Sequence, residues 1–179
     1  MNIHGLILVA MFAALTAVGA FIQIPIPPVP ITLQMFFVFL AGALLGPKMG
    51  ALSQIVYLTM GLVGLPIFSQ GGGPGYVLNP TFGFLIGYIF ASFIVGYFLK
   101  NQENLSFAKV FSACMMGVVI IYIIGAPYMN VILNVVLGLE VTMLQSFIFM
   151  LPFLPGDILK AVGVALIAPR IKKAIKQQI

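Results

Sequence analysis

The sequence predicts an all-α integral membrane protein, folded as a bundle of six transmembrane helices. Of its 179 residues, 62% are hydrophobic and only 6% are charged, and the mean hydropathy is +1.20. A soluble domain of this size could not bury so much apolar surface. Apolar stretches of about 16 to 22 residues recur along the chain, each long enough to cross a hydrocarbon core of roughly 30 Å. The stretches are continuous and not alternating, which favours helices over membrane strands.

Prolines and glycines divide the chain into the six expected spans. The first span ends at the segment PIPPVP, because proline lacks a backbone donor and clashes with a continuing helix. The turn GPK separates the second span from the third, and Pro80 begins the fourth, where a missing N–H costs nothing. No Lys or Arg precedes the first span, so we interpret it as a retained helix and not a signal peptide. The spans are expected near residues 5–24, 32–46, 49–65, 80–99, 107–125 and 153–169.

Residues 126–152 fit no full span. The stretch is apolar, but Pro127, Asn130, Asn134, Gly138 and Glu140 interrupt it. We therefore expect one or two short helices there, on the outer face of the membrane. The sequence shows no internal repeat and no soluble module, so residues 1–179 are predicted to form a single membrane-embedded domain.

The basic residues indicate how the bundle is oriented. The net charge of +5 could suggest nucleic acid as a partner, but most of the charges gather at the ends of spans. Six spans place both termini on one side, and basic residues mark the cytoplasmic ends of spans. The sequence thus predicts a multi-pass protein of the cell membrane with both termini cytoplasmic and no nucleic-acid partner. Seven of the eight basic residues agree with this orientation: Lys48, Lys100, Lys109, Arg170, Lys172, Lys173 and Lys176.

Two ionisable residues are expected inside the last span, in the segment LPGDILKA. Asp157 and Lys160 are three residues apart and therefore share one face of a helix. Lys160 precedes Arg170 by ten residues, or roughly 15 Å along a helix. Ionisable groups inside a span usually mark a substrate path or pair with one another. The alternatives are a structural ion pair and a lysine that extends outward. We favour a binding role, because Pro155 and Gly156 begin the helix and so place Asp157 in its first turn, near unpaired N–H groups.

The segment GGGPGYVLNP, residues 71–80, separates the third and fourth spans. Glycines let a backbone pass close to a small molecule, and loops on a rigid scaffold commonly carry binding groups. Asn79 is a favoured helix N-cap, but capping uses only its side-chain oxygen and leaves two amide donors for a ligand. We interpret residues 66–78 as a lid, in which Gly73 and Tyr76 contact the ligand. A flexible linker with a structural cap is the alternative.

Small residues line the first span. Ala10 and Ala14, like Ala13 and Ala17, have the spacing that lets membrane helices approach closely. Polar residues inside other spans are expected to form interhelical hydrogen bonds: Gln34, Ser53, Gln54 and Thr59.

Several chemistries are absent from the sequence. It has no HExxH, GxSxG, CxxC or Walker motif. Three acidic residues, one histidine and one cysteine leave little for acid–base or metal chemistry. We therefore expect no catalytic site, no metal site and no cofactor, and ATP hydrolysis is excluded as a function of this chain alone.

Two segments resemble one family of membrane proteins. They are IPIPPVPITLQMFFVFLAGALLGPKMGALSQIVYLTMGLVGLPIFSQGGGPGYVLNPTFGFLIGYIFASFIVGYFL and FLPGDILKAVGVAL. Both are similar to BioY, the biotin-specific substrate-capture component of energy-coupling factor (ECF) transporters. The most specific motifs are the glycine loop with its Asn-Pro and the Gly-Asp-x-x-Lys, and the resemblance is weakest in residues 126–152.

The resemblance implies a function and the residues that carry it. It implies a six-helix bundle that binds biotin from outside and docks onto a membrane coupling subunit, energised by two cytosolic ATPase subunits. The family's biotin-contacting asparagine, aspartate and lysine correspond to Asn79, Asp157 and Lys160. Its coupling contact, an alanine-rich face of the first helix, corresponds to Ala10 and Ala14. Biotin, membrane lipid and these subunits are thus the expected partners.

The polar residues agree with a biotin site on chemical grounds. The ureido group of biotin offers two N–H donors and one carbonyl acceptor. Asp157 can accept, Lys160 can donate, and Asn79 can do either. Two alternatives stay open: a stand-alone biotin carrier, and a membrane-embedded enzyme that uses Asp157 and Lys160.

Overall fold

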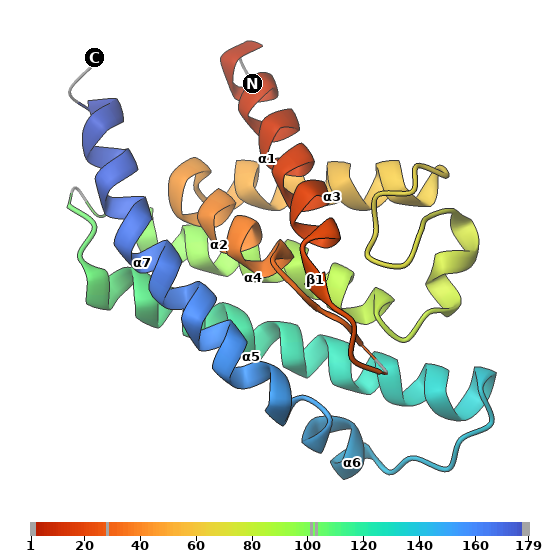
Figure 1. The fold of residues 1–179 in the computed structure, drawn as a ribbon. Coiled ribbons are helices and arrows are strands. Elements are labelled where there is room, and N and C mark those ends of the chain that lie inside the picture. The colour runs from red at the N-terminus through yellow and green to blue at the C-terminus, as the bar shows by residue number, and fades with distance from the viewer. Residues whose placement is uncertain (1–2, 28, 101, 103, 177–179) are drawn as a thin grey trace.

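The protein is an all-α bundle (Figure 1), as the sequence predicts. The computed structural model describes residues 3–27, 29–100, 102 and 104–176, without the side chains of 175 and 176. The role expected of the Lys176 side chain in the basic tail therefore lies outside the described part. The α-helices of the described part are α1 (Ile3–Phe21), α2 (Gln34–Leu45), α3 (Pro47–Leu62), α4 (Phe82–Leu99), α5 (Phe107–Val131), α6 (Met143–Ile148) and α7 (Leu154–Lys176).

Two helices of the bundle, α2 and α3, are shorter than a full membrane span. α2 has 12 residues and α3 has 16, fewer than the roughly 20 that a full span needs. Both pack between α1 and α4. Four segments of the described chain are long and apolar enough to cross a membrane: Ile3–Phe21, Phe82–Leu99, Phe107–Val136 and Met143–Ala174.

The largest difference from the expected boundaries is in α5. We expected this span to end near residue 125, but the helix continues past Pro127 to Val131 and then through a wider turn, Ile132–Val136. The extra turns of α5 pack closely against α4. A Cβ added to Gly83 on α4 would lie only 2.3 Å from the Cβ of Tyr128 on α5, so the two helices are in contact there. The rest of residues 126–152 contains the short helix α6, in agreement with the expected short helices.

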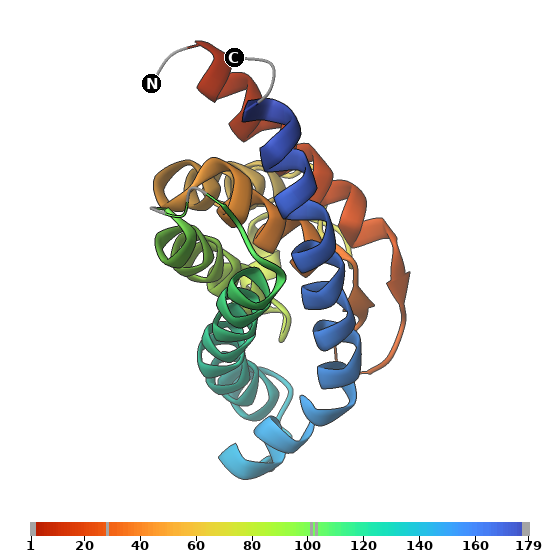
Figure 2. The ribbon, with the colours of Figure 1, turned by 90° about the vertical axis from the view of Figure 1, so that its left-hand side faces the viewer.

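Both termini lie at one end of the bundle (Figures 1 and 2). The α2–α3 turn and the α4–α5 connection lie there too, and Lys172 Nζ donates a hydrogen bond to the Gln102 carbonyl at 3.2 Å. The opposite end carries a hairpin of β1 (Gln23–Ile24) and β2 (Ile31–Thr32), the glycine loop and the α5–α6 connection. The loops thus segregate to the two ends as the spans predict.

Buried polar side chains connect the first three helices. Gln54 Nε2 on α3 donates to Thr16 Oγ1 on α1 at 3.3 Å, and Gln34 Nε2 on α2 donates to the Tyr57 hydroxyl on α3 at 2.7 Å. These contacts confirm the interhelical hydrogen bonds expected of Gln34 and Gln54. Ser53 differs, because its hydroxyl donates to the Gly50 carbonyl of its own helix.

Candidate functional site

Asp157 and Lys160 form a buried ion pair near the start of α7. Lys160 Nζ lies 2.7 Å from Asp157 Oδ1, and the side chain of Asp157 is 2% exposed. Tyr122 on α5 donates its hydroxyl to the other carboxylate oxygen, Oδ2, at 2.6 Å. Each carboxylate oxygen therefore has a hydrogen-bond donor, which offsets the cost of burying a polar group. The expectation that the two residues share a helix face is confirmed.

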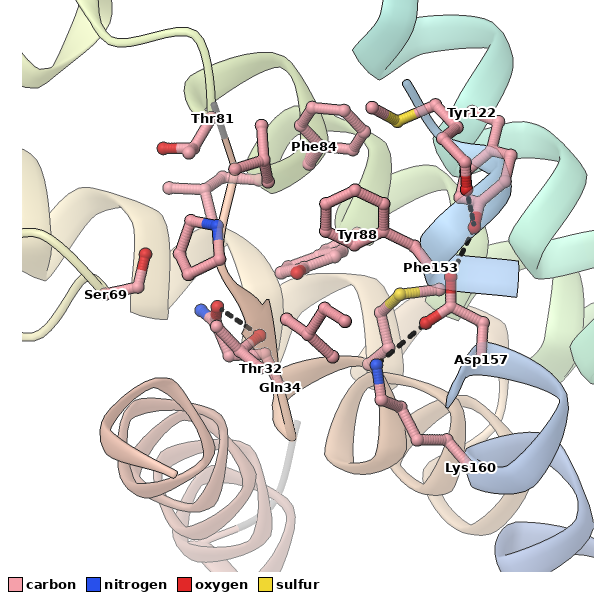
Figure 3. A pocket seen from close by; sticks show the side chains of 16 residues that line it. Thr32, Gln34, Ser69, Thr81, Phe84, Tyr88, Tyr122, Phe153, Asp157 and Lys160 are labelled. Carbon is pink, nitrogen blue, oxygen red and sulfur yellow. Dashed lines mark hydrogen bonds and ion pairs between the residues drawn. The ribbon is translucent and has the colours of Figure 1, made fainter. Parts of the chain in front are cut away.

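The ion pair lines a pocket between α2, α4, α5 and α7, with β2 along one side (Figure 3). Apolar side chains, among them Phe84, Met150 and Phe153, form much of its wall. The polar side chains that line it are Thr32, Gln34, Ser69, Thr81, Tyr88, Tyr122, Asp157 and Lys160.

The pocket is contracted in this conformation. Its free volume is about 40 Å³, enough for a few waters at roughly 10–15 Å³ each. Pockets that hold small molecules typically measure about 300–1,000 Å³. Segments that line the pocket must therefore move before a larger ligand can enter.

A second polar group lies across the pocket from the ion pair (Figure 3). Thr32 Oγ1 donates to Gln34 Oε1 at 2.9 Å, and the amide nitrogen of Gln34 donates to Tyr57. Tyr57 in turn donates to the Ile67 carbonyl at 3.0 Å, so the chain of bonds holds the Gln34 amide in one orientation. On the opposite wall, the ammonium of Lys160 has three donors, and the hydrogen bond to Asp157 uses one of them. The pocket thus offers anchored polar groups at both walls.

The structure does not bring Asn79 to the ion pair. Its Oδ1 accepts from the backbone N–H and the hydroxyl of Thr81, at 2.9 and 2.8 Å, in the manner of an Asx turn. Its Nδ2 donates to Gln70 Oε1 at 2.8 Å. Both ends of the amide are engaged, and Asn79 is not among the residues that line the pocket. Its contact with a ligand stays a prediction, since it requires Nδ2 to exchange its partner.

Tyr76 and Gly73 are not part of the pocket lining. Tyr76 is buried, packs against Phe68, and its hydroxyl is hydrogen-bonded to Thr81 Oγ1 at 2.9 Å. Gly73 N donates to the Gly61 carbonyl at 2.7 Å. Neither residue lines the pocket, so their contacts with a ligand also stay predictions. Thr81, which connects Tyr76 and Asn79, does line it.

Sequence reasoning missed several residues of this pocket. Tyr122 lies 35 positions before Asp157 in a continuous apolar run, so no local spacing connects the two residues. Thr32, Thr81 and Tyr88 were not singled out, and Gln34 was expected only as an interhelical hydrogen bond. A hydroxyl or amide inside an apolar span was the one available signal, because such groups need a partner in lipid.

Two sets of hydrogen bonds hold the loop of residues 66–78 in its present position, one to the hairpin and one within the loop. Gln23 Nε2 at the start of the hairpin donates to the Ser69 carbonyl at 3.1 Å, and Phe68 and Gly71 exchange backbone hydrogen bonds. Gly71 and Gly73 have φ of +119° and +96°, which other residues rarely adopt. The loop and the hairpin are therefore connected to each other beside the pocket.

Ala10 and Ala14 lie on the outside of the bundle, as expected. Both are exposed, whereas Ala13 on the same helix is 7% exposed and packs inward. This arrangement leaves the face of α1 that carries Ala10 and Ala14 open to another helix.

The comparison with known proteins identifies the family. A family model described as the BioY family matches residues 1–177. The chain belongs to the BioY family. A BioY relative from Lysinibacillus sphaericus, named "Probable biotin transporter BioY", is 48% identical over 174 residues, which cover 96% of this chain and 88% of the relative. The biotin transporter BioY of Thermotoga maritima is 40% identical over 169 residues, covering 94% and 95% of the two chains.

Solved structures agree with the BioY assignment. The crystal structure of the S-component for biotin from an ECF-type ABC transporter matches with a TM-score of 0.83 and 32% identity, over 97% of this chain and 95% of the other. FolT bound with folic acid matches with a TM-score of 0.65 and 19% identity, over the same shares of the two chains, which shows a common fold.

Removing one charge of the ion pair should lower stability more than removing both. Asp157→Asn leaves Lys160 as an uncompensated buried charge, and breaking a buried pair typically costs about 3–5 kcal/mol. We expect this variant to unfold at a lower temperature in detergent than Asp157→Asn/Lys160→Met, in which neither charge remains. Glu140→Gln, which removes an exposed carboxylate, should leave the unfolding temperature unchanged. A double variant less stable than the single one would contradict a stabilising ion pair.

Proposed function

We propose that this protein binds biotin from the extracellular side and delivers it for uptake as the substrate-specific S component of an ECF-type ABC transporter. The observation that carries the proposal is the buried group of Tyr122, Asp157 and Lys160 in a largely apolar pocket. The names of the BioY relatives and the match to the biotin S-component support it.

The chemistry of the pocket suits biotin. The fused rings of biotin are compact and apolar, and Phe84, Met150 and Phe153 offer them an apolar surface. Asp157 accepts from a ureido N–H, and Lys160 donates to the ureido carbonyl with an N–H that Asp157 does not use. An analogue that lacks the ureido group would leave these buried groups unpaired, which is a strong basis for rejection.

The glycine loop and the hairpin act as the entrance to the pocket in this proposal. A pocket of about 40 Å³ must expand to admit biotin, and the loop beside it includes Ser69, one of its lining residues. Opening would separate Gln23 from the Ser69 carbonyl and release Asn79, Tyr76 and Gly73 to contact the ligand. Closure then excludes water, which strengthens the hydrogen bonds at Asp157 and Lys160.

ATP-driven uptake requires partner subunits, because this chain has no Walker motif. We assign that role to a membrane coupling subunit and two cytosolic ATPase subunits. The exposed face of α1 with Ala10 and Ala14 is the docking surface for the coupling subunit, since small residues let helices approach closely in lipid. Both termini and the basic end of the bundle face the cytoplasm.

The two alternatives differ in their support. A stand-alone biotin carrier would use the same pocket and would need no coupling subunit. A membrane-embedded enzyme has no support, because the relatives are named transporters and the carboxylate of Asp157 is engaged on both oxygens.

Asp157→Asn should weaken biotin binding about ten- to a hundredfold, since a hydrogen bond to a charged group contributes about 1.5–3 kcal/mol. Tyr122→Phe keeps the ring and removes one donor to Asp157, so we expect a smaller loss. Glu140→Gln is the matched control for a lost carboxylate and should bind as the parent does. Equilibrium binding of biotin to the purified chain in detergent measures all three. Equal affinity of Asp157→Asn and the parent would refute the site.

The glycine loop should exchange amide hydrogens more slowly in the presence of biotin. Ordering the loop has an entropic cost of about 1–2 kcal/mol per residue, which contacts with the ligand must offset. Gly71→Ala/Gly73→Ala places side chains at positive φ and should slow biotin exchange or weaken binding, with the fold retained. Gly75→Ala, where a Cβ meets open space, is the control. Hydrogen exchange that is identical with and without biotin would make the loop a linker only.

Ala14→Trp should leave biotin binding intact and abolish uptake by the complete transporter. A bulky side chain on this exposed face keeps the partner helix from approaching. Val119→Trp, on the exposed face of α5, adds the same bulk elsewhere and should transport normally. Copurification with the coupling subunit and uptake of labelled biotin are the measurements. Loss of biotin binding with assembly preserved would mean that this face does not dock the partner.

A further inference from the structure

A hollow at the end of the bundle that carries both termini contains three lysines from separate parts of the chain. Lys48 lies at the start of α3, Lys100 follows α4, and Lys172 is near the end of α7. The hollow measures about 490 Å³, so it is large enough for a small molecule or a head group.

The charges of these lysines are not compensated within the described part of the chain. The single ion pair found there is that of Asp157 with Lys160, in the pocket at the other end. Glu140 lies in the α5–α6 connection, also at the other end, and Glu103 is outside the described residues. Lys172 donates to a carbonyl, that of Gln102, which does not neutralise it. Three like charges around one hollow repel each other, and an anion would remove that repulsion.

The start of α3 adds to the attraction for an anion. Gly46, Pro47, Lys48 and Met49 all line the hollow, and Gly46 brings no side chain to cap the helix. The N-terminal end of a helix carries a partial positive charge that attracts an anion. Pro47 has no N–H, so Lys48 and Met49 carry the first backbone donors of α3. This feature reinforces the lysines, which come from three elements and carry the argument.

The walls below the lysines are apolar. Leu44, Leu45 and Leu99 line the same hollow, at the ends of apolar helices where the bundle meets the membrane surface. A soluble anion would use only the lysines, whereas a phospholipid has a phosphate for the lysines and a glycerol and acyl chains for the leucines. Basic pockets between membrane helices bind the head groups of anionic lipids in this way.

We propose that this hollow binds the phosphate of an anionic phospholipid. The lysines and the start of α3 hold the phosphate, and the leucines contact the glycerol and the first part of the acyl chains. The proposal depends on the membrane location of the chain and not on its ligand, so it stands apart from biotin binding.

Native mass spectrometry of the detergent-purified protein, with phosphatidylglycerol or phosphatidylcholine added, tests this site. Lys48→Gln/Lys100→Gln removes two charges from the hollow, and Arg170→Gln/Lys173→Gln removes two exposed charges of the same end that do not line it. We expect the parent to retain phosphatidylglycerol over phosphatidylcholine. The first double variant should lose about tenfold in phosphatidylglycerol binding and the second less than about twofold.

Three results would overturn the proposal. Equal losses in the two double variants would mean a diffuse surface attraction. Binding of inorganic phosphate through the same lysines, without retention of lipid, would assign the hollow to a soluble anion. If Lys48→Gln/Lys100→Gln binds lipid as the parent does but no longer forms a complex with its partner subunits, the hollow is instead a contact site for an acidic surface of a partner protein. Biotin binding, measured on the same samples, should be normal in both variants, which separates this test from that of the biotin site.

Discussion

A carboxylate buried among apolar helices needs a donor for each oxygen, and the pocket of this protein depends on how that need is met at Asp157. One donor, Lys160, comes from the same helix one turn away, and the other, Tyr122, comes from α5. The second bond requires α5 and α7 to pack at one particular distance and rotation. The residues that stabilise the charge thereby also set the position of two walls of the pocket.

The same requirement for partners shapes the opposite wall and the loop beside it. Thr32, Gln34 and Tyr57 form a chain of hydrogen bonds from β2 to α3 that ends on the Ile67 carbonyl, in the loop of residues 66–78. On the other side of the loop, Asn79 and Tyr76 meet at Thr81. The side chains of Asn79 and Tyr76 are thus already hydrogen-bonded in the contracted state. In the proposed binding mode, a ligand that contacts Asn79 replaces its bond to Gln70.

The two ends of the bundle treat charge in opposite ways. At the pocket end, the two charges that line the pocket, Asp157 and Lys160, are buried and paired with each other. At the end with the termini, the lysines are exposed or half-buried and lack a described carboxylate partner. Such charges are stabilised by water and by anions at the membrane surface. The two ends of the bundle therefore differ in how their charges are placed.

The sequence by itself determined the features that arise from local periodicity and composition. These are the helical membrane fold, the segregation of loops to two ends and the shared face of Asp157 and Lys160. Tertiary packing decided the rest. Tyr122 becomes a partner of Asp157, and Pro127 stays inside a helix, only because α5 packs against α7 and α4. Asn79 faces Gln70 and Thr81, and not the ion pair, because the glycine loop folds back on its own side chains. Contacts between segments far apart in the chain leave no spacing in the sequence from which they could be read.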